Sequence, residues 1–278
     1  MSRVPSRLVL LLVTALLPAC IVYAPLGGDL APTGLVEVVV REPDSFWTSE
    51  KVLVLAIDGV LTDESTSSLL GGTRNSVADL VAELDVAVRD PDVRAVVLRI
   101  DSPGGGVTAA DLMHRELLRF KERRGIPVVA CMMDTAASGG VYVAMAADHV
   151  FALPTTVTGS IGVITQVTDA SRLLDMLGVR NDSIKSGAFK DMGSPYRALT
   201  DGERAILQDL VDEYFERFVQ VVDAGRPGLD EAAVRELADG RIFTARQALD
   251  AGLIDRIGYL DEAIDSARRT RTSAAGPR

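Results

Sequence analysis

From residue 51 onward, short apolar runs alternate with segments in which apolar residues recur at helical spacing. Each run predicts a buried strand, and each spaced segment predicts a helix. The predicted strands are residues 52–57, 93–100, 127–132 and 149–153, and the predicted helices between them are 75–89, 109–123 and one that begins near Ser138. Strands that alternate with helices in this way predict an α/β domain with a largely parallel, covered sheet.

After residue 164 the chain becomes more polar. The expected elements there are a helix at 170–177, a short strand, a polar loop at 185–197, and helices at 229–238, 244–251 and 260–269. Thr200 and Glu203 form a capping-box pattern, which opens a long amphipathic helix that ends near residue 223. Neither a repeat nor a linker divides residues 51–269, so we expect one domain there and a disordered tail at 270–278.

The N-terminal segment follows a different pattern. Arg3 and Arg7 precede a ten-residue apolar run at 8–17. Ten helical residues rise only about 15 Å, which is too short for a hydrocarbon core of roughly 30 Å. A positive start followed by a short apolar run and small residues is typical of an export signal.

The apolar run ends in the sequence LPAC, which places a cysteine at position 20. This pattern resembles the bacterial lipoprotein lipobox and implies cleavage before Cys20 and acylation of that residue. We therefore expect a signal peptide at 1–19 and a lipid-anchored tether at 20–50, with the domain held at a membrane and facing outside the cytoplasm. The alternative is an uncleaved anchor that uses the weaker apolar stretch through Leu26.

Charge and composition exclude several classes of protein. The chain has 29 basic and 39 acidic residues and a formal net charge of −10, so nothing indicates a phosphate-binding surface for nucleic acid. It has two cysteines and two histidines, whose spacing fits no zinc site. If Cys20 carries lipid, Cys131 is left as a single thiol in an apolar run. We expect it to be a small buried side chain without a disulfide.

A glycine-rich segment at 101–106 lies between a predicted strand and a predicted helix, and it allows three interpretations. It could be a plain turn. Gly104, Gly106 and Ala109 also fit the loose dinucleotide-binding fingerprint, with Asp134 as a ribose-binding acid. Alternatively, a backbone N–H in this segment could face a developing oxyanion.

A second segment places Ser138 between small residues at the end of a strand and the start of a helix. This arrangement follows the logic of a nucleophile elbow, although the motif differs from G-x-S-x-G. The competing interpretation is an ordinary N-cap serine, which is compatible with a nucleophilic role.

A nucleophilic serine needs a base. His114 is expected on the surface, and three turns of helix would hold His149 roughly 15 Å from Ser138. The alternative base is one of four lysines. Lys190 follows Phe189, which could help to desolvate it, whereas an isolated lysine is ordinarily a solvated surface charge.

A third segment, at 156–163, combines hydroxyls and glycines in a pattern that predicts a tight turn beside Ser138. Ser160 could hydrogen-bond a neutral lysine and orient it, as the third member of a catalytic set does. It could also simply satisfy backbone groups of the turn.

Taken together, four stretches resemble the signal peptide peptidase A family, the S49 serine peptidases. They are LRIDSPGGGVTA, DTAASGGVYVAMAAD, TVTGSIGV and KSGAFKDMGSP, which begin at residues 98, 134, 156 and 185 and stand in family order. The resemblance covers residues 51–265 and implies a single domain with a ClpP/crotonase-like fold of repeated β-β-α units. It also assigns roles to five positions: Ser138 as nucleophile, Lys190 as general base, Ser160 as the residue that orients the lysine, and the N–H groups of Gly105 and Gly139 as the oxyanion hole.

The resemblance implies further properties. The chain corresponds to the short, single-domain form, which assembles as homo-octamers whose sites combine the serine of one subunit with the lysine of its neighbour. It implies a membrane-anchored endopeptidase that degrades remnant signal peptides and other short or unfolded chains without a metal or organic cofactor. The lipobox is a departure, since family members often use a transmembrane helix. The alternatives are a non-catalytic scaffold of the same fold and a crotonase-type acyl-CoA hydratase or isomerase.

Overall fold

The computed structural model describes residues 38, 50–64, 66–67 and 73–274. The expected signal peptide and Cys20 lie outside the described residues, as does the expected tether apart from residues 38 and 50. Within the described part of the chain, no helix is both long and apolar enough to cross a bilayer. The described residues from Glu50 onward belong to one compact unit.

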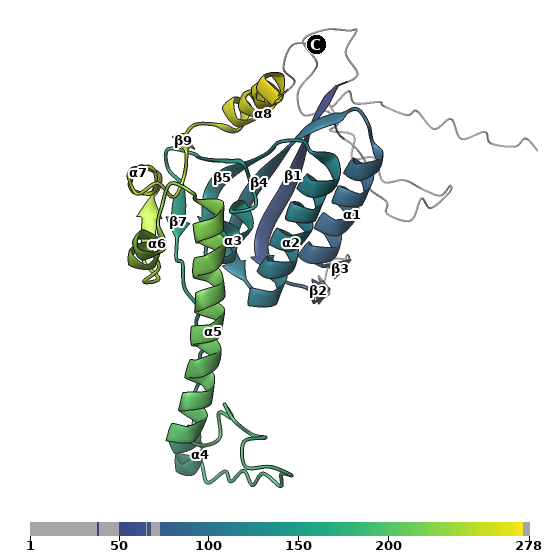
Figure 1. The fold of residues 1–278 in the computed structure, drawn as a ribbon. Helices are drawn as coiled ribbons and strands as arrows, with labels where there is room; N and C mark the ends of the chain where they lie inside the picture. The colour runs from purple at the N-terminus through teal and green to yellow at the C-terminus, as the bar shows by residue number, and fades with distance from the viewer. Residues whose placement is uncertain (1–37, 39–49, 65, 68–72, 275–278) are drawn as a thin grey trace, which may run out of the picture. The chain divides into compact units, whose positions relative to one another are not determined.

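A seven-stranded sheet forms the centre of this unit (Figure 1). Its strands, in spatial order, are β1 (Lys51–Leu61), β4 (Val93–Gly105), β5 (Val128–Ala137), β6 (His149–Ala152) and β9 (Arg256–Ile257), with β7 (Val157–Gly159) paired to β5 and β8 (Ile242–Thr244) paired to β7. Every pairing is parallel except β7 with β8. A separate small hairpin joins β2 (Thr66–Ser67) and β3 (Thr73–Arg74). The expected parallel α/β architecture is confirmed.

Helices cover both faces of the sheet. On one face lie α1 (Ser76–Arg89), α2 (Val107–Arg124) and α3 (Gly139–Ala144), and α8 (Leu260–Ala274) packs on the other. Alternate residues of β4 enter the two cores: Leu98 belongs to the larger one and Val97 to the one beneath α8. Burial on both faces explains why these strands are continuous apolar runs in the sequence.

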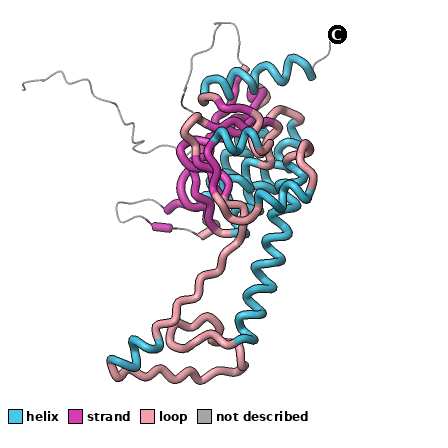
Figure 2. The backbone as a smooth tube through the Cα atoms, turned by 90° about the vertical axis from the view of Figure 1, so that its left-hand side faces the viewer, coloured by secondary structure: helices cyan, strands magenta, loops and turns pink. Residues whose placement is uncertain are grey.

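The remaining helices follow the sheet in the sequence. They are α4 (Ser171–Met176), α5 (Asp201–Gly225), α6 (Glu231–Leu237) and α7 (Ala245–Asp250). The second half of α5 packs against α3, whereas its first half extends away from the sheet (Figures 1 and 2). We call residues 163–213 the arm. Glu203 is the only buried residue in the arm.

Several element ends differ from the sequence-based prediction. β1, β4 and β5 continue to Leu61, Gly105 and Ala137, so the glycine-rich segment belongs largely to a strand. The short strand expected after residue 177 is absent, since residues 179–184 form no regular element. Helix α8 runs to Ala274, five residues beyond its predicted end at 269, and residues 275–278 lie outside the described residues.

His114 is buried, so the prediction that it lies on the surface was wrong. The inward stripe of α2 includes His114 along with Met113 and Leu117. Its ring packs edge-on against Tyr142, with 5.4 Å between the ring centroids. Burial lowers the pKa of His114 to about 4.

Candidate active site

Ser138 occupies a strained turn between β5 and α3. Its backbone has φ 51° and ψ −118°. Among the described residues, only Ser138 and Ser160 combine a side chain with positive φ. A conformation of this kind costs on the order of 1–3 kcal/mol and is concentrated at functional sites. The Ser138 side chain makes no capping hydrogen bond to α3, so the ordinary N-cap interpretation does not account for this residue.

The glycine-rich end of β4 lies directly against this turn. A Cβ on Gly104 would lie 2.7 Å from the amide nitrogen of Gly139 and 2.8 Å from Cβ of Ser138. Gly104 also has φ +101°, a conformation that side-chain-bearing residues rarely adopt. Likewise, a Cβ on Gly105 would lie 2.2 Å from the carbonyl oxygen of Leu61. Glycine at both positions therefore lets the end of β4 approach the Ser138 turn and Leu61 closely. A backbone packed this close to Ser138 favours the oxyanion-hole interpretation over the dinucleotide-binding one.

Ser102 holds this glycine turn in place, and the sequence reasoning missed it. Its side chain is fully buried. The Oγ donates to the Gly59 carbonyl oxygen at 2.6 Å and accepts from the Gly104 N–H at 3.1 Å. The available signal was a hydroxyl residue continuing a buried strand, but the adjacent Pro-Gly made it resemble an ordinary turn residue.

Ser160 lies beside Ser138. β7 pairs with the last residues of β5, and the Ser138 N–H donates to the Gly159 carbonyl oxygen at 2.8 Å. The Ser160 N–H donates to the Arg241 carbonyl oxygen at 2.7 Å. These bonds hold both positive-φ serines at one end of the sheet. Neither serine hydroxyl hydrogen-bonds to any residue the structure describes.

Neither histidine reaches this turn. His149 pairs with Val129 at the opposite end of β5. Nine residues of extended strand separate Val129 from Ser138, which is about 30 Å and farther than the predicted 15 Å. His114 contacts Tyr142, one turn beyond Ser138, from the side of α2. Within one chain His149 is therefore too far from Ser138 to act as its base, and His114, which is buried against Tyr142, forms no hydrogen bond with Ser138.

Lys190 is exposed and belongs to the arm, which projects away from the sheet (Figure 2). Helix α5 is fixed to the body of the molecule just beyond the arm, where the Phe218 ring lies 5.1 Å from that of Tyr142. Glu203, which anchors the loop carrying Lys190, precedes Phe218 by fifteen residues, or about 22 Å of helix. A single chain therefore does not bring Lys190 to Ser138.

Polar and charged groups also fix α5 to the body of the molecule, just beyond the arm. Tyr142 donates to Asp111 Oδ1 at 2.5 Å, and Arg217 of α5 donates to the same oxygen at 3.0 Å. Burial and the bond to Asp111 raise the pKa of the Tyr142 hydroxyl well above its ordinary value, so it remains a donor. This contact joins α2, α3 and α5 one helical turn from Ser138.

The structure distinguishes the two lysines of the 185–195 stretch. Lys185 Nζ donates to Asp191 Oδ1 at 2.6 Å and to the Ala188 carbonyl oxygen at 3.0 Å. Lys190, by contrast, forms no ion pair with any described residue. Its neighbour Phe189 lies over the start of α5 near Gly202 rather than covering a buried amine.

Comparison with known proteins identifies the family. Residues 120–273 match the sequence pattern described as peptidase family S49. The chain belongs to this family. The matched range includes Ser138, Ser160 and Lys190 but begins after Gly105, and it assigns no role to any of them. The predicted family is confirmed.

Named relatives extend the match towards the N-terminus. A protein of Enterococcus faecium named as a signal peptide peptidase SppA is 38% identical over 81% of this chain and 64% of its own length. A protein of Synechocystis sp. named as a protease is 42% identical over 72% of this chain and 70% of its own. The chain thus spans a little under two thirds of the Enterococcus relative.

A solved structure supports the predicted fold. A variant of the protease subunit ClpP1 from Listeria monocytogenes matches 76% of this chain and 94% of its own, with a TM-score of 0.50 and 17% identity. The ClpP/crotonase-like fold is confirmed by this match and by the parallel sheet.

Proposed function

We propose that this chain is a serine endopeptidase with a Ser/Lys dyad whose two members come from neighbouring copies. Lys190 of one copy, in its neutral form, takes the proton of Ser138 in the next while Oγ attacks the scissile carbonyl carbon. The N–H groups of Gly105 and Gly139 stabilise the resulting oxyanion, and Ser160 orients the amine. The amine leaves with the proton, and water then releases the acyl-enzyme.

The observation that carries this proposal is the conformation of Ser138. Ser138 has positive φ, a hydroxyl without a partner among the described residues, and a glycine turn packed against its backbone, which together are what a nucleophile needs. As the first residue of α3, Gly139 has an N–H without an intrahelical acceptor, and the Ser138 side chain does not cap it. That N–H is available to an oxyanion beside Oγ.

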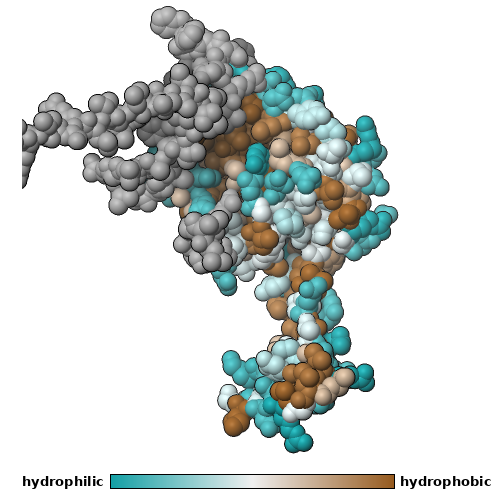
Figure 3. Space-filling model, turned by 180° about the vertical axis from the view of Figure 1, so that it is seen from behind, coloured by the Kyte–Doolittle hydropathy of each residue, from teal (hydrophilic) through white to brown (hydrophobic). Residues whose placement is uncertain are grey.

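The arm supports the division of the dyad between copies. It exposes large apolar side chains, including Met176 at 85% and Leu177 at 67% of full exposure. Figure 3 shows apolar residues gathered at the end of the molecule that holds the arm. Monomeric soluble proteins rarely expose extensive apolar patches, so a second copy is the partner we propose for this surface. Burial there would also remove water from Lys190, which favours the neutral amine.

Attachment and substrates form the remaining part of the proposal. The lipobox resemblance supports a lipid anchor at Cys20 outside the cytoplasm, and the name of the Enterococcus relative supports cleaved signal peptides as substrates. Radiolabelled palmitate should be incorporated into the expressed full chain but not into its Cys20→Ser variant. Equal labelling of both would show that the anchor is assigned wrongly.

Peptide hydrolysis tests the catalytic assignment. The assembled wild type should cleave a fluorogenic apolar peptide, and Ser138→Ala and Lys190→Ala should each lose activity by at least about a hundredfold. Wild-type activity in either variant would disprove the dyad. A non-catalytic scaffold predicts that a fluorophosphonate fails to label Ser138, and a crotonase-type enzyme predicts turnover of an acyl-CoA thioester.

A further inference from the structure

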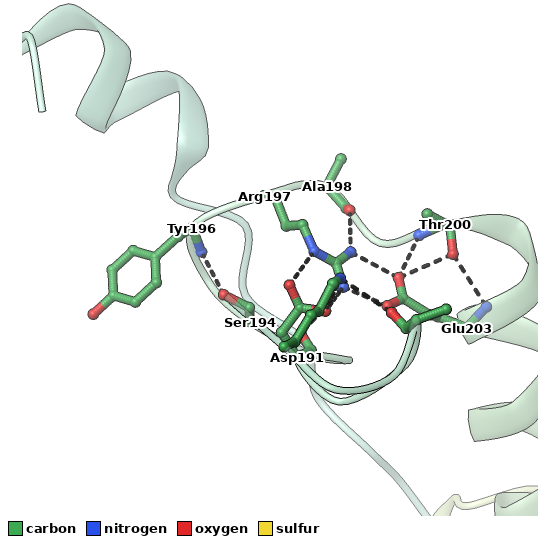
Figure 4. A network of polar contacts seen from close by, with 9 residues as sticks. Asp191, Ser194, Tyr196, Arg197, Ala198, Thr200 and Glu203 are labelled. Atoms are coloured by element: carbon green, nitrogen blue, oxygen red, sulfur yellow. Dashed lines mark hydrogen bonds and ion pairs between the residues drawn. The ribbon is translucent and has the colours of Figure 1, made fainter. Parts of the chain in front are cut away.

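Asp191, which directly follows Lys190, is bound by Arg197 (Figure 4) and by Lys185. Lys185 Nζ lies 2.6 Å from Asp191 Oδ1. Arg197 Nη2 lies 2.6 Å from the same oxygen, and Arg197 Nε lies 3.0 Å from Oδ2. Hydrogen bonds from Arg197 and then from Lys185 hold the pKa of the Asp191 carboxyl well below its ordinary value.

Arg197 also binds a second carboxylate. Its Nη1 donates to Glu203 Oε2 at 2.8 Å, and its Nη2 bonds to Glu203 Oε1. Glu203 is only 1% exposed and accepts the Thr200 N–H at 2.9 Å in the capping box of α5. The guanidinium therefore links the loop that carries Lys190 to the first turn of α5.

The loop between these anchors is a series of tight turns. The N–H groups of Lys190, Met192 and Ser194 each donate to the carbonyl oxygen three residues earlier, at 3.0–3.2 Å. With Arg197 holding Asp191, these turns fix the direction in which the Lys190 backbone faces. A lysine at position 197 would keep the positive charge but could not bind both carboxylates at once, because only a guanidinium has the planar fork that this requires.

We propose that Arg197 is a positioning residue that, together with Lys185, occupies the Asp191 carboxylate and so keeps it from stabilising the ammonium form of Lys190. This inference rests on the proposed role of Lys190 as general base. A free carboxylate beside a lysine favours the charged lysine, which cannot accept a proton. Two cations on Asp191 cancel that attraction, so the network favours the form of Lys190 that catalysis needs.

The charged groups of the network are Lys185, Asp191, Arg197 and Glu203. In the copy that supplies Ser138, Asp101 lies on β4 before Gly105, and Asp134 lies on β5 before Ser138. These two carboxylates stay unchanged in every variant below, so their effect on the pH profile is constant.

The test is the pH dependence of kcat/KM for the assembled full chain. Arg197→Met should shift the acid limb upward by about 0.5–1 pH unit, because Asp191 is left partly uncompensated. Asp191→Asn should shift the limb downward, because two cations then remain beside Lys190. The double variant should return close to the wild-type limb, as should Arg197→Lys, which keeps the cation.

The matched control is Arg235→Met, which removes another ion-paired arginine, on α6, and should leave the limb unchanged.

The outcomes separate this inference from the proposed function. If Lys190→Ala keeps wild-type activity, the proposed function fails, whatever the limbs do. If Lys190→Ala is inactive but Arg197→Met and Asp191→Asn lower the rate with identical limbs, the network is merely structural and the inference fails alone. Should Arg197→Met not fold, the downward shift in Asp191→Asn decides, and an unchanged limb there overturns the proposal.

Discussion

Two inactive variants of this chain should restore activity to each other when they assemble together. Ser138→Ala chains keep Lys190 but lack the nucleophile, and Lys190→Ala chains keep the nucleophile but lack the base. If each site takes its serine from one copy and its lysine from the next, a mixed assembly contains some complete sites. If each chain completes its own site, mixing restores nothing.

The position of Lys190 on the arm and the statistics of random mixing together set the activity expected of the mixed assembly. About 22 Å of α5 separates Glu203 from Phe218, and a lysine side chain reaches only about 6 Å, so under the proposed function no chain completes its own site. In a random equal mixture, half of the sites have Ser138, and half of those face a neighbour that has Lys190. Restored activity should therefore be about one quarter of the wild-type value for a head-to-tail ring.

The assay is hydrolysis of a fluorogenic peptide by co-expressed variants over a range of mixing ratios. For random assembly, activity should follow the product of the two fractions and reach its maximum at equal amounts. The matched control replaces the Lys190→Ala partner with a chain that carries both substitutions, which supplies neither group and should restore nothing.

Native mass spectrometry must first establish that mixed assemblies have formed. Mixed assemblies without activity would refute the division of the dyad between copies, because every geometric requirement for a shared site would then be met. Activity that did not depend on the mixing ratio would point to contaminating protease.

Further expectations concern the site's support and the core. Gly104→Ala should lower the free energy of unfolding by more than about 2 kcal/mol and abolish peptide cleavage, because its Cβ would lie 2.7 Å from the Gly139 nitrogen; a denaturant melt with unchanged stability would contradict this. Ser102→Ala should cost about 1–3 kcal/mol, since it leaves the Gly59 carbonyl and the Gly104 N–H unsatisfied, and should reduce kcat more than it raises KM. The pKa of His114 is lowered from its ordinary 6.5 to about 4 by burial, so the unfolded chain binds that proton more tightly. Stability should therefore fall as pH decreases from 6.5 to 4, by up to about 3 kcal/mol, and His114→Phe should flatten this slope in urea melts at successive pH values.

The sequence was enough to place Ser138 and Ser160 because both sit in runs of small residues at strand ends. The apolar pattern located β1, β4 and β5 for a different reason: strands buried on both faces are continuous apolar runs. Their ends were placed too early, since glycine-containing segments were read as turns. The pairing of β4 with β1 continues through Gly104 and Gly105, because glycine at these positions lets the backbone pack closely against Leu61 and Gly139.

Residues whose roles depend on contacts distant in sequence were not predictable. Ser102 looks like a turn residue until Gly59 is seen to lie within 2.6 Å of its hydroxyl. His114 looks like a polar surface residue until α3 is packed on α2. The long helix from Thr200 was predicted, but its length alone did not show that its first half leaves the body and carries Lys190 away from Ser138.

In the proposed function, the association of two copies both holds the arm in one conformation and completes the catalytic site. Ordering a residue costs about 1–2 kcal/mol of backbone conformational entropy, which burial of apolar surface ordinarily offsets. Between residues 163 and 213 the only buried residue is Glu203, a carboxylate, and the large apolar side chains there face outward. Contacts within one chain therefore contribute little to holding the arm in place. A second copy that covers those side chains would stabilise the arm. The same association would bring Lys190 to Ser138 of that copy, since Lys190 does not reach Ser138 of its own chain.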